Sequence, residues 1–185
     1  MIEGIKNKTR EKMEQTIHVY RKDLGAIRTG RASLSIFEGI MVDYYGTPTP
    51  ISQVASLSTP ESRLIIIQPW EPRLIPEIEK AIQTSPLGLT PANDGKIIRI
   101  PIPPLTEERR KEIVKLVKKM AEDARVAVRN IRRDSNEEIR KAGKEANISE
   151  DEIKKTQDDI QKLTDQYIHK VDEILKKKEL EIMEV

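Results

Sequence analysis

Apolar residues recur three or four positions apart in three long stretches of the chain, which is the spacing of an amphipathic α-helix. The first stretch runs from Ile2 to Arg28, and the second from Thr106 to about Lys141. The third follows Ser149, which can cap a helix, with Glu152 in the capping-box position. A helix over the first stretch would extend ~40 Å, too far to bury its apolar side on a small sheet. The pattern therefore predicts three long helices packed along their length.

The second stretch has two chemically different sides. On a helical wheel its apolar residues gather in one sector and are expected to be buried; they are Ile113, Val117, Met120, Ala124, Val128, Ile131 and Ile139. Basic residues lie roughly opposite, namely Lys118, Arg125, Arg129, Arg132, Arg133 and Arg140. Gly143 is expected to terminate this helix.

Between the first two helices the chain changes character, because all eleven prolines lie between Thr29 and Leu105. A short helix is predicted from Pro76 to about Thr84, and Trp70 is expected to pack against it, with an exposed partner contact as the alternative. Gly46–Pro50 is predicted to be a loop, because proline cannot donate to a strand ladder. Strands are predicted at residues 40–45, 54–58, 63–68 and 97–100.

This order of elements predicts an α+β fold in which a small mixed domain is inserted into a long three-helix bundle. The bundle would comprise residues 1–29 and 106–185, and the inserted domain residues 31–104. Only two chain segments would join the domains, so a hinge is expected where they cross. The hinge residues are Thr29, Gly30, Arg31, Pro103, Pro104 and Leu105.

The net charge of +2 conceals an uneven distribution. Residues 1–28 carry seven basic and four acidic groups, residues 106–146 thirteen and nine, and residues 149–185 seven and eleven. One interpretation is that these charges only form surface ion pairs on a solvent-exposed helical bundle and bind no ligand. The four arginines at Arg125, Arg129, Arg132 and Arg133 favour a phosphate-binding face instead, because the guanidinium fork matches phosphate geometry.

Catalytic chemistry finds little support in the sequence. There is no cysteine for a disulfide or a thiol nucleophile, and no glycine-rich P-loop that could cradle a nucleotide. His18 and His169 lie beside core positions of separate helices and are interpreted as half-exposed bundle residues. No residue spacing suggests a metal site or a cofactor, and no segment resembles a signal peptide or a membrane span. We therefore expect a soluble intracellular protein that is not an enzyme.

Several motifs spread over nearly the whole chain are similar to those of one family. They are Arg28-Thr29-Gly30-Arg31-Ala32, Asp43-Tyr44-Tyr45-Gly46-Thr47-Pro48-Thr49-Pro50, Leu87-Gly88-Leu89, Pro103-Pro104-Leu105-Thr106-Glu107-Glu108-Arg109-Arg110, Ala127-Val128-Arg129-Asn130-Ile131-Arg132-Arg133 and Gln161-Lys162-Leu163-Thr164-Asp165. In these motifs and in its length the chain resembles bacterial ribosome recycling factor.

The resemblance implies an L-shaped molecule with the outline of a transfer RNA, made of a three-helix bundle and a small β/α/β sandwich. It implies binding to the 70S ribosome after termination, through large-subunit ribosomal RNA, and subunit splitting together with elongation factor G and GTP. An arginine matching Arg132 is central to RNA binding in the family, and Arg129, Arg133 and Arg28 lie in matching basic motifs. The small domain would swing about the hinge when the elongation factor engages, and the protein would be a cytoplasmic monomer.

Two other interpretations of the residues remain open. A coiled-coil scaffold would oligomerise through its apolar stripes and form an elongated dimer. A nucleic-acid chaperone would bind free RNA or DNA duplex as well as it binds ribosomes.

Overall fold

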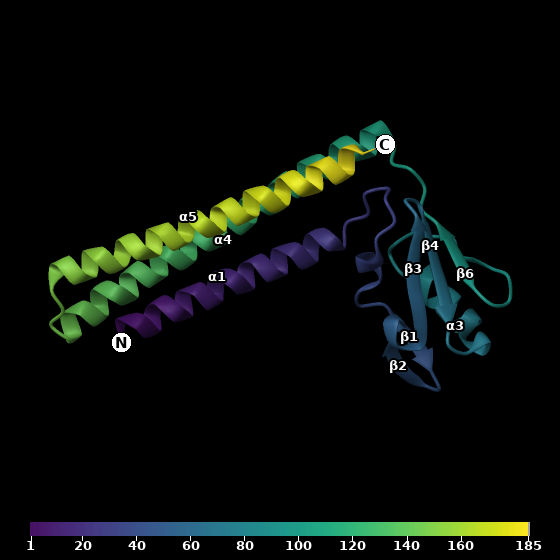
Figure 1. Ribbon diagram of the computed structural model, residues 1–185, viewed down its shortest axis with the longest axis horizontal. Coiled ribbons are helices and arrows are strands. Elements are labelled where there is room, and N and C mark those ends of the chain that lie inside the picture. Colours follow the sequence, from purple (N-terminus) through teal and green to yellow (C-terminus); the bar gives the residue numbers. More distant parts are fainter. Residues whose placement is uncertain (185) are drawn as a thin grey trace. The chain divides into compact units, whose positions relative to one another are not determined.

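Three long helices build the first of two structural units in the computed structural model, which describes residues 1–184. This unit comprises Met1–Leu24 and Glu112–Leu180, and the second comprises Gly25–Lys111 with the residues after Leu180. The helices are α1 (Ile2–Gly25), α4 (Glu107–Glu145) and α5 (Glu150–Met183) (Figure 1). The α+β fold class predicted from the sequence is confirmed.

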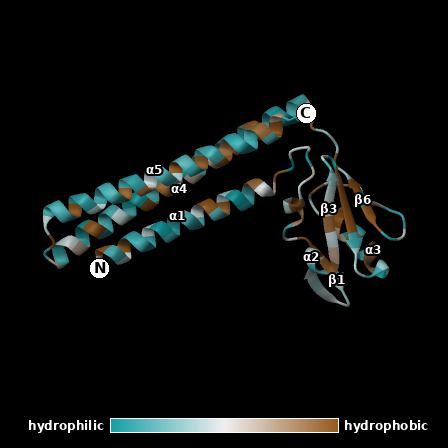
Figure 2. Cartoon of the chain, viewed as in Figure 1, coloured by the Kyte–Doolittle hydropathy of each residue, from teal (hydrophilic) through white to brown (hydrophobic). Residues whose placement is uncertain are grey.

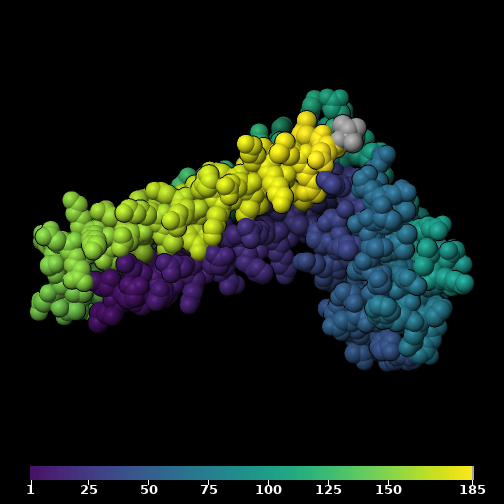
Figure 3. Space-filling view, viewed as in Figure 1, coloured from purple at the N-terminus to yellow at the C-terminus, as the bar shows by residue number. Residues whose placement is uncertain are grey.

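Contacts between the helices give their directions. The buried Thr9 hydroxyl of α1 is 2.6 Å from the Ser135 hydroxyl of α4, and Lys8 hydrogen-bonds to Glu138, so these two helices run antiparallel. The Tyr167 hydroxyl of α5 donates to the Glu14 carboxylate at 2.7 Å, and side chains of α1 and α5 meet along the face shown in Figure 3. Burial and this hydrogen bond raise the pKa of Tyr167 to about 12.

The bundle core is built from the predicted apolar stripes. On α4 most of the stripe is buried as expected, but Met120 and Ile131 are only half-buried. Ala121 and Ser135 are also buried, although the predicted apolar stripe did not include them. Ser135 can be buried because its hydroxyl forms a hydrogen bond with the Thr9 hydroxyl. The buried apolar side chains of the bundle are Met13, Ile17, Tyr20 and Leu24 of α1, Ile113, Val117, Ala121, Ala124, Val128, Ile139 and Ala142 of α4, and Ile160, Tyr167 and Val171 of α5.

Gly143 does not terminate α4, so that prediction was wrong. The helix continues to Glu145. Asn147, in the turn that follows, has a left-handed backbone (φ 49°), and the Ile148 amide donates to the Gly143 carbonyl at 2.9 Å. Gly143 is buried, and a Cβ there would collide with the Ile153 side chain of α5. The glycine therefore allows close packing of α4 and α5 where the two helices meet.

The second unit contains two antiparallel sheets. β1 (Met41–Tyr44) and β2 (Thr47–Pro50) form a hairpin. The other sheet has the strand order β3-β4-β6-β5, with β3 (Ala55–Glu61), β4 (Leu64–Pro69), β5 (Ala92–Asn93) and β6 (Ile98–Pro101). The helical elements are a 3₁₀ turn at Leu34–Phe37, α2 (Ile51–Val54), a 3₁₀ turn at Pro72–Leu74 and α3 (Ile75–Gln83).

One isoleucine-rich cluster fills the core of this unit. Ile65 and Ile67 of β4 and Ile98 and Ile100 of β6 are fully buried, and α3 adds Ile78 and Ile82. Apolar colour is accordingly dense on β4 and β6 in Figure 2, whereas the long helices are largely hydrophilic with apolar residues interspersed. Among the described residues, no helix is long and apolar enough to cross a membrane.

Two sequence predictions in this unit were wrong. Thr47–Pro50 is a strand and not a loop: Pro48 and Pro50 are two positions apart, so both missing N–H groups point to the open edge, away from β1. The prediction that Trp70 packs against α3 was also wrong, because 65% of the Trp70 surface is exposed to solvent.

The turn between β1 and β2 is strained. Tyr45 has φ 52° and Gly46 φ 81°, and the Gly46 amide donates to the Asp43 carboxylate at 2.7 Å. Two-residue turns of this type favour Asn-Gly, because a bulky residue in the left-handed region costs roughly 1 to 3 kcal/mol.

The close approach at Gly143 can be tested by substitution. Gly143→Ala adds helix propensity but drives a methyl group into Ile153, so we expect the free energy of unfolding in urea to fall by about 1 kcal/mol or more. Gly4→Ala is the matched control, because a Cβ at Gly4 of α1 has nothing within 4 Å, and we expect it to be neutral or stabilising. Ile153→Val, which removes the colliding terminal methyl, should partly rescue Gly143→Ala. Equal stability of the two alanine variants would show that the contact is unimportant.

Candidate nucleic-acid interface on the helical bundle

The predicted arginine row lies along the middle of α4, a helix whose first turn is capped by the Thr106 hydroxyl, which accepts from the Arg109 amide at 3.1 Å. The row does not form a uniform positive stripe. Its members differ in exposure and in the partner that each guanidinium contacts.

Arg125 is one of two members of the row that are only partly exposed, the other being Arg132. Its side chain is 20% exposed, and its guanidinium contacts Asp172 of α5 at 2.6 Å and Glu122 of α4 at 3.1 Å. Burial lowers the pKa of Arg125, but its bonds to Asp172 and Glu122 outweigh burial and raise the pKa above its ordinary value. Two carboxylates therefore neutralise this arginine, and it fastens α4 to α5 as much as it contributes positive surface.

Arg129 is more exposed, at 44% of its side chain, and shares Glu122 with Arg125 at 3.3 Å. The hydrogen bond from Arg125, and then that from Arg129, hold the pKa of Glu122 below its usual value, so this carboxylate stays ionised. One negative charge shared by two guanidinium groups leaves Arg129 only partly compensated.

Arg132 has a neutral partner. Its guanidinium donates to the Gln161 side-chain carbonyl of α5 at 2.9 Å, and the Gln161 amide in turn donates to Asp165 at 2.9 Å. The Nε atom of Arg132 is buried, with no hydrogen-bond partner among the described residues. The side chain is thus held in place while its full positive charge is retained, which suits a group that must receive a phosphate.

Arg133 and Arg140 project from the exposed side of α4. Within residues 1–184 neither takes part in an ion pair, although Glu137 lies at helical spacing from both. Together with Arg129 and Arg132 they form the open arginine face, the name used below for these four residues. Contacts of such a face are made mainly to phosphates rather than to base edges.

Sequence reasoning did not identify Gln161 as part of this site. The sequence did mark Gln161, because this residue begins one of the motifs that carry the family resemblance. Its contact with Arg132, however, depends on how α4 and α5 pack together. Arg28, the remaining predicted RNA-binding residue, lies in the second unit, because α1 ends at Gly25 rather than at Arg28. The Ser35 hydroxyl donates to the Gly25 carbonyl at 3.0 Å and so caps the end of α1.

The predicted hinge residues also belong to the second unit. Gly30 has φ 78°, and a Cβ there would lie 3.1 Å from the Leu105 side chain, so the two connecting segments touch. The Thr29 hydroxyl donates to Glu181 at 3.0 Å, and Arg31 pairs with Glu184 at 2.6 Å. These contacts tie the first connecting segment to the end of α5.

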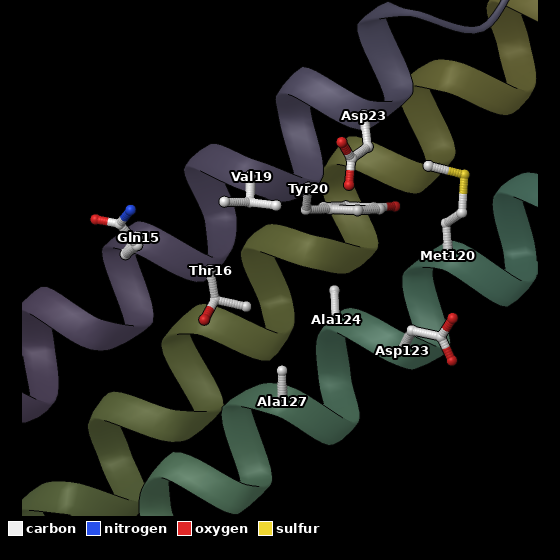
Figure 4. A pocket seen from close by; sticks show the side chains of 9 residues that line it. All are labelled: Gln15, Thr16, Val19, Tyr20, Asp23, Met120, Asp123, Ala124 and Ala127. Atoms are coloured by element: carbon white, nitrogen blue, oxygen red, sulfur yellow. The ribbon is translucent and has the colours of Figure 1, made fainter.

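An apolar groove of about 360 Å³ lies between α1 and α4 (Figure 4). Val19, Tyr20, Met120, Ala124 and Ala127 are among its lining residues. Burial raises the pKa of Tyr20 to about 12, and its hydroxyl has no hydrogen-bond partner among the described residues. A tyrosine with this pKa stays protonated at neutral pH and is a poor base.

No group of three or more His, Asp or Glu side chains within residues 1–184 is arranged to hold a metal ion.

Comparison with known proteins agrees with this architecture. A family model described as "Ribosome recycling factor" matches residues 20–183. The chain is 57% identical to the ribosome-recycling factor of Geobacillus sp. (strain WCH70), with both chains covered completely. It is 58% identical to that of Syntrophomonas wolfei subsp. wolfei, again over the whole of both chains.

Two solved structures are similar as well. One, described as the solution structure of the ribosome recycling factor, has 43% identity and a TM-score of 0.83, with 100% of this chain and 98% of that chain covered. The other has 42% identity and a TM-score of 0.72, with both chains covered completely. It is described as models for the T. thermophilus ribosome recycling factor and the E. coli elongation factor G bound to the E. coli post-termination complex.

The contrast between Arg125 and Arg133 leads to a stability prediction. Arg125→Ala removes a guanidinium that bridges two carboxylates, so we expect the free energy of unfolding to fall by roughly 1 to 2 kcal/mol. Arg133→Ala is the matched control on the same helix and should change it by less than about 0.5 kcal/mol. Both values would come from urea denaturation followed by circular dichroism. If the two variants lost the same stability, the structural role assigned to Arg125 would be incorrect.

Proposed function

Because this chain belongs to the ribosome recycling factor family, we propose that it binds the post-termination ribosome and splits its subunits together with elongation factor G and GTP. The family consists of non-enzymatic translation factors, so GTP hydrolysis is assigned to elongation factor G. Its relative from T. thermophilus has been placed with elongation factor G on the post-termination complex, which supports these two partners.

The open arginine face is the single observation that carries the proposal for this chain. Arg132 and Arg133 meet no carboxylate among the described residues, and Arg129 shares one, so the face keeps most of its positive charge. The three helices hold it as one rigid unit, which suits recognition of a folded RNA by shape and phosphate position. We assign the central contact with large-subunit ribosomal RNA to Arg132, with Arg129, Arg133 and Arg28 in supporting roles.

Arg125 has a secondary place in this assignment. Asp172 and Glu122 already compensate its charge, so its contribution to RNA binding would be indirect, through the position of α4 against α5.

We assign the hinge to residues 29–31 and 103–105, with residues 1–29 and 106–185 as the ribosome-binding part and residues 31–104 as the moving part. Gly30 supports this assignment, because its left-handed backbone packs directly on Leu105 of the second connecting segment. A change in one segment must then be accommodated by the other.

Burial of the apolar stripes favours a monomer over the coiled-coil scaffold. The core residues of α1, α4 and α5 are buried within one chain, so their stripes are not available to a second copy. A cytoplasmic location follows from the proposed ribosomal target.

Loss of the Arg132 guanidinium tests the RNA-binding assignment. We expect Arg132→Ala to keep its helical content and melting temperature but to lose most of its affinity for 70S ribosomes in a sedimentation assay. The slope of log affinity against log salt should flatten by about one unit. Arg99→Ala, an exposed arginine of the small unit, is the control and should bind normally.

Unchanged ribosome binding by Arg132→Ala would contradict the assignment. Equal affinity of the unaltered protein for free RNA duplex and for ribosomes would instead favour the non-specific nucleic-acid chaperone.

The hinge assignment makes a separate prediction. Gly30→Ala places a methyl group against Leu105 in a left-handed backbone, so we expect ribosome binding to persist and the rate of subunit splitting to fall. Gly88→Ala is the matched control: it has φ 65° and therefore comparable backbone strain, but a Cβ there has nothing within 4 Å. Light scattering after addition of elongation factor G and GTP measures the splitting. Equal splitting rates for the two variants would count against a mechanical role of the hinge.

A further inference from the structure

The apolar groove between α1 and α4 is lined by none of the residues assigned to RNA binding. Val19 and Tyr20 face it from α1, and Met120, Ala124 and Ala127 face it from α4 (Figure 4). The hollow exists because α4 places alanines where longer side chains would fill the space between the helices. Its volume of about 360 Å³ falls within the range of roughly 300 to 1,000 Å³ that is typical of small-molecule sites.

The charged residues along the groove are all acidic. Asp23 of α1 and Asp123 of α4 are both exposed, and no basic residue is among those that line the groove. Within residues 1–184 neither carboxylate takes part in a hydrogen bond or an ion pair, although Lys119 lies one turn before Asp123. The groove differs in this respect from the helices that form it, because residues 1–28 and 106–146 carry more basic than acidic groups. It therefore favours a cation over an anion.

The negative charge is concentrated at one end of the groove. Because α1 and α4 run antiparallel, Asp23 lies across from Met120 and Asp123, whereas Thr16 lies across from Ala127 (Figure 4). One end is thus acidic and the rest is lined mainly by apolar side chains. A ligand with an apolar body and a single positive group matches this arrangement.

Two groups at the acidic end are unfavourable for the fold by itself. Asp23 lies in the last turn of α1, which ends at Gly25, so its carboxylate faces the negative end of the helix dipole. The Tyr20 hydroxyl is buried without a hydrogen-bond partner among the described residues, which costs the fold an unmade hydrogen bond. An ammonium group would supply a counter-charge to the carboxylate and an N–H donor to the hydroxyl oxygen.

A protein partner fits the groove less well than a small molecule does. A specific protein interface buries roughly 800 Å² on each partner. Of the exposed large apolar residues in the described part of the chain, only Val19 lines the groove. The groove thus offers a hollow for one apolar group rather than a broad apolar face.

We propose that the groove between α1 and α4 binds a small organic cation that has an apolar body and one ammonium group. The body lies against Val19, Ala124 and Ala127, and the ammonium group lies at the end marked by Asp23 and Asp123. This site is separate from the open arginine face and does not depend on the proposed ribosomal function.

Three probes that share a phenyl ring but differ in charge test the proposal on the full-length protein. They are phenethylamine, phenethyl alcohol and phenylacetate. Titration followed by NMR of the backbone amides should give a Kd of about 1 mM for the amine, with shifts confined to the two helical segments that line the groove. The alcohol should bind about fivefold more weakly, and phenylacetate more weakly still, because its carboxylate is repelled by Asp23 and Asp123.

Two variants separate charge from shape. Replacing both aspartates, Asp23→Asn with Asp123→Asn, should weaken binding of the amine about fivefold and leave binding of the alcohol unchanged. Ala127→Leu fills the groove and should weaken binding of both probes by about tenfold or more. Asp134→Asn, exposed on α4 outside the groove, is the matched control and should bind like the unaltered protein. Circular dichroism and the melting temperature report whether each variant is folded.

Several outcomes would overturn the proposal. Equal affinity for the amine and the alcohol would do so, as would shifts spread over the whole surface or no binding of the amine about tenfold above the expected Kd. Unchanged binding of the amine by the double aspartate variant would also overturn it. That result would be decisive even if Ala127→Leu failed to fold, because both aspartates are exposed and their replacement leaves the core intact. Ribosome binding is measured separately, so the proposed function is unaffected by any of these results.

Discussion

Mutual burial of three apolar helix stripes is the constraint on which the structure depends. Each long helix has one apolar side, and none could bury that side on the small sheets of the second unit. Once α1, α4 and α5 close around Met13, Val128 and Ile160, the opposite sides of the helices are fixed in direction. A charged side chain on α4 therefore has a defined position, which a flexible basic tail could not provide.

The packing of α4 against α5 also sorts the arginines by role. Asp172 and Gln161 lie on the same helix, but one presents a carboxylate and the other a neutral amide. Arg125 is consequently neutralised and holds the helices together, whereas Arg132 is positioned without losing its charge. The contrast explains how a helix rich in both acidic and basic residues retains a positive face, and why net charge alone describes the molecule poorly.

The small unit has a different chemistry. Its core is a dense cluster of isoleucines, its charges nearly cancel, and the hydroxyl of the exposed Tyr45 donates to the Glu71 carboxylate. The two units therefore differ in surface chemistry as well as in fold, because the row of basic side chains lies on the bundle.

Local patterns in the sequence by themselves determined the three long helices, the strands at 40–45, 54–58, 63–68 and 97–100, and the short helix after Pro76. Dispersed motifs determined the family, and the comparisons confirm it. These features are local because helical periodicity, capping and strand propensity act over a few neighbouring residues. Only the tertiary structure decided that Gly143 is a packing residue, that Thr47–Pro50 pairs with β1, that Trp70 is exposed, and that Arg125 rather than Arg132 is neutralised. Each of these features depends on a residue that is distant in the sequence and is brought close by the packing of two elements. Asp172, for example, contacts Arg125 from 47 positions away. No local pattern in the sequence encodes how the elements are aligned when they pack.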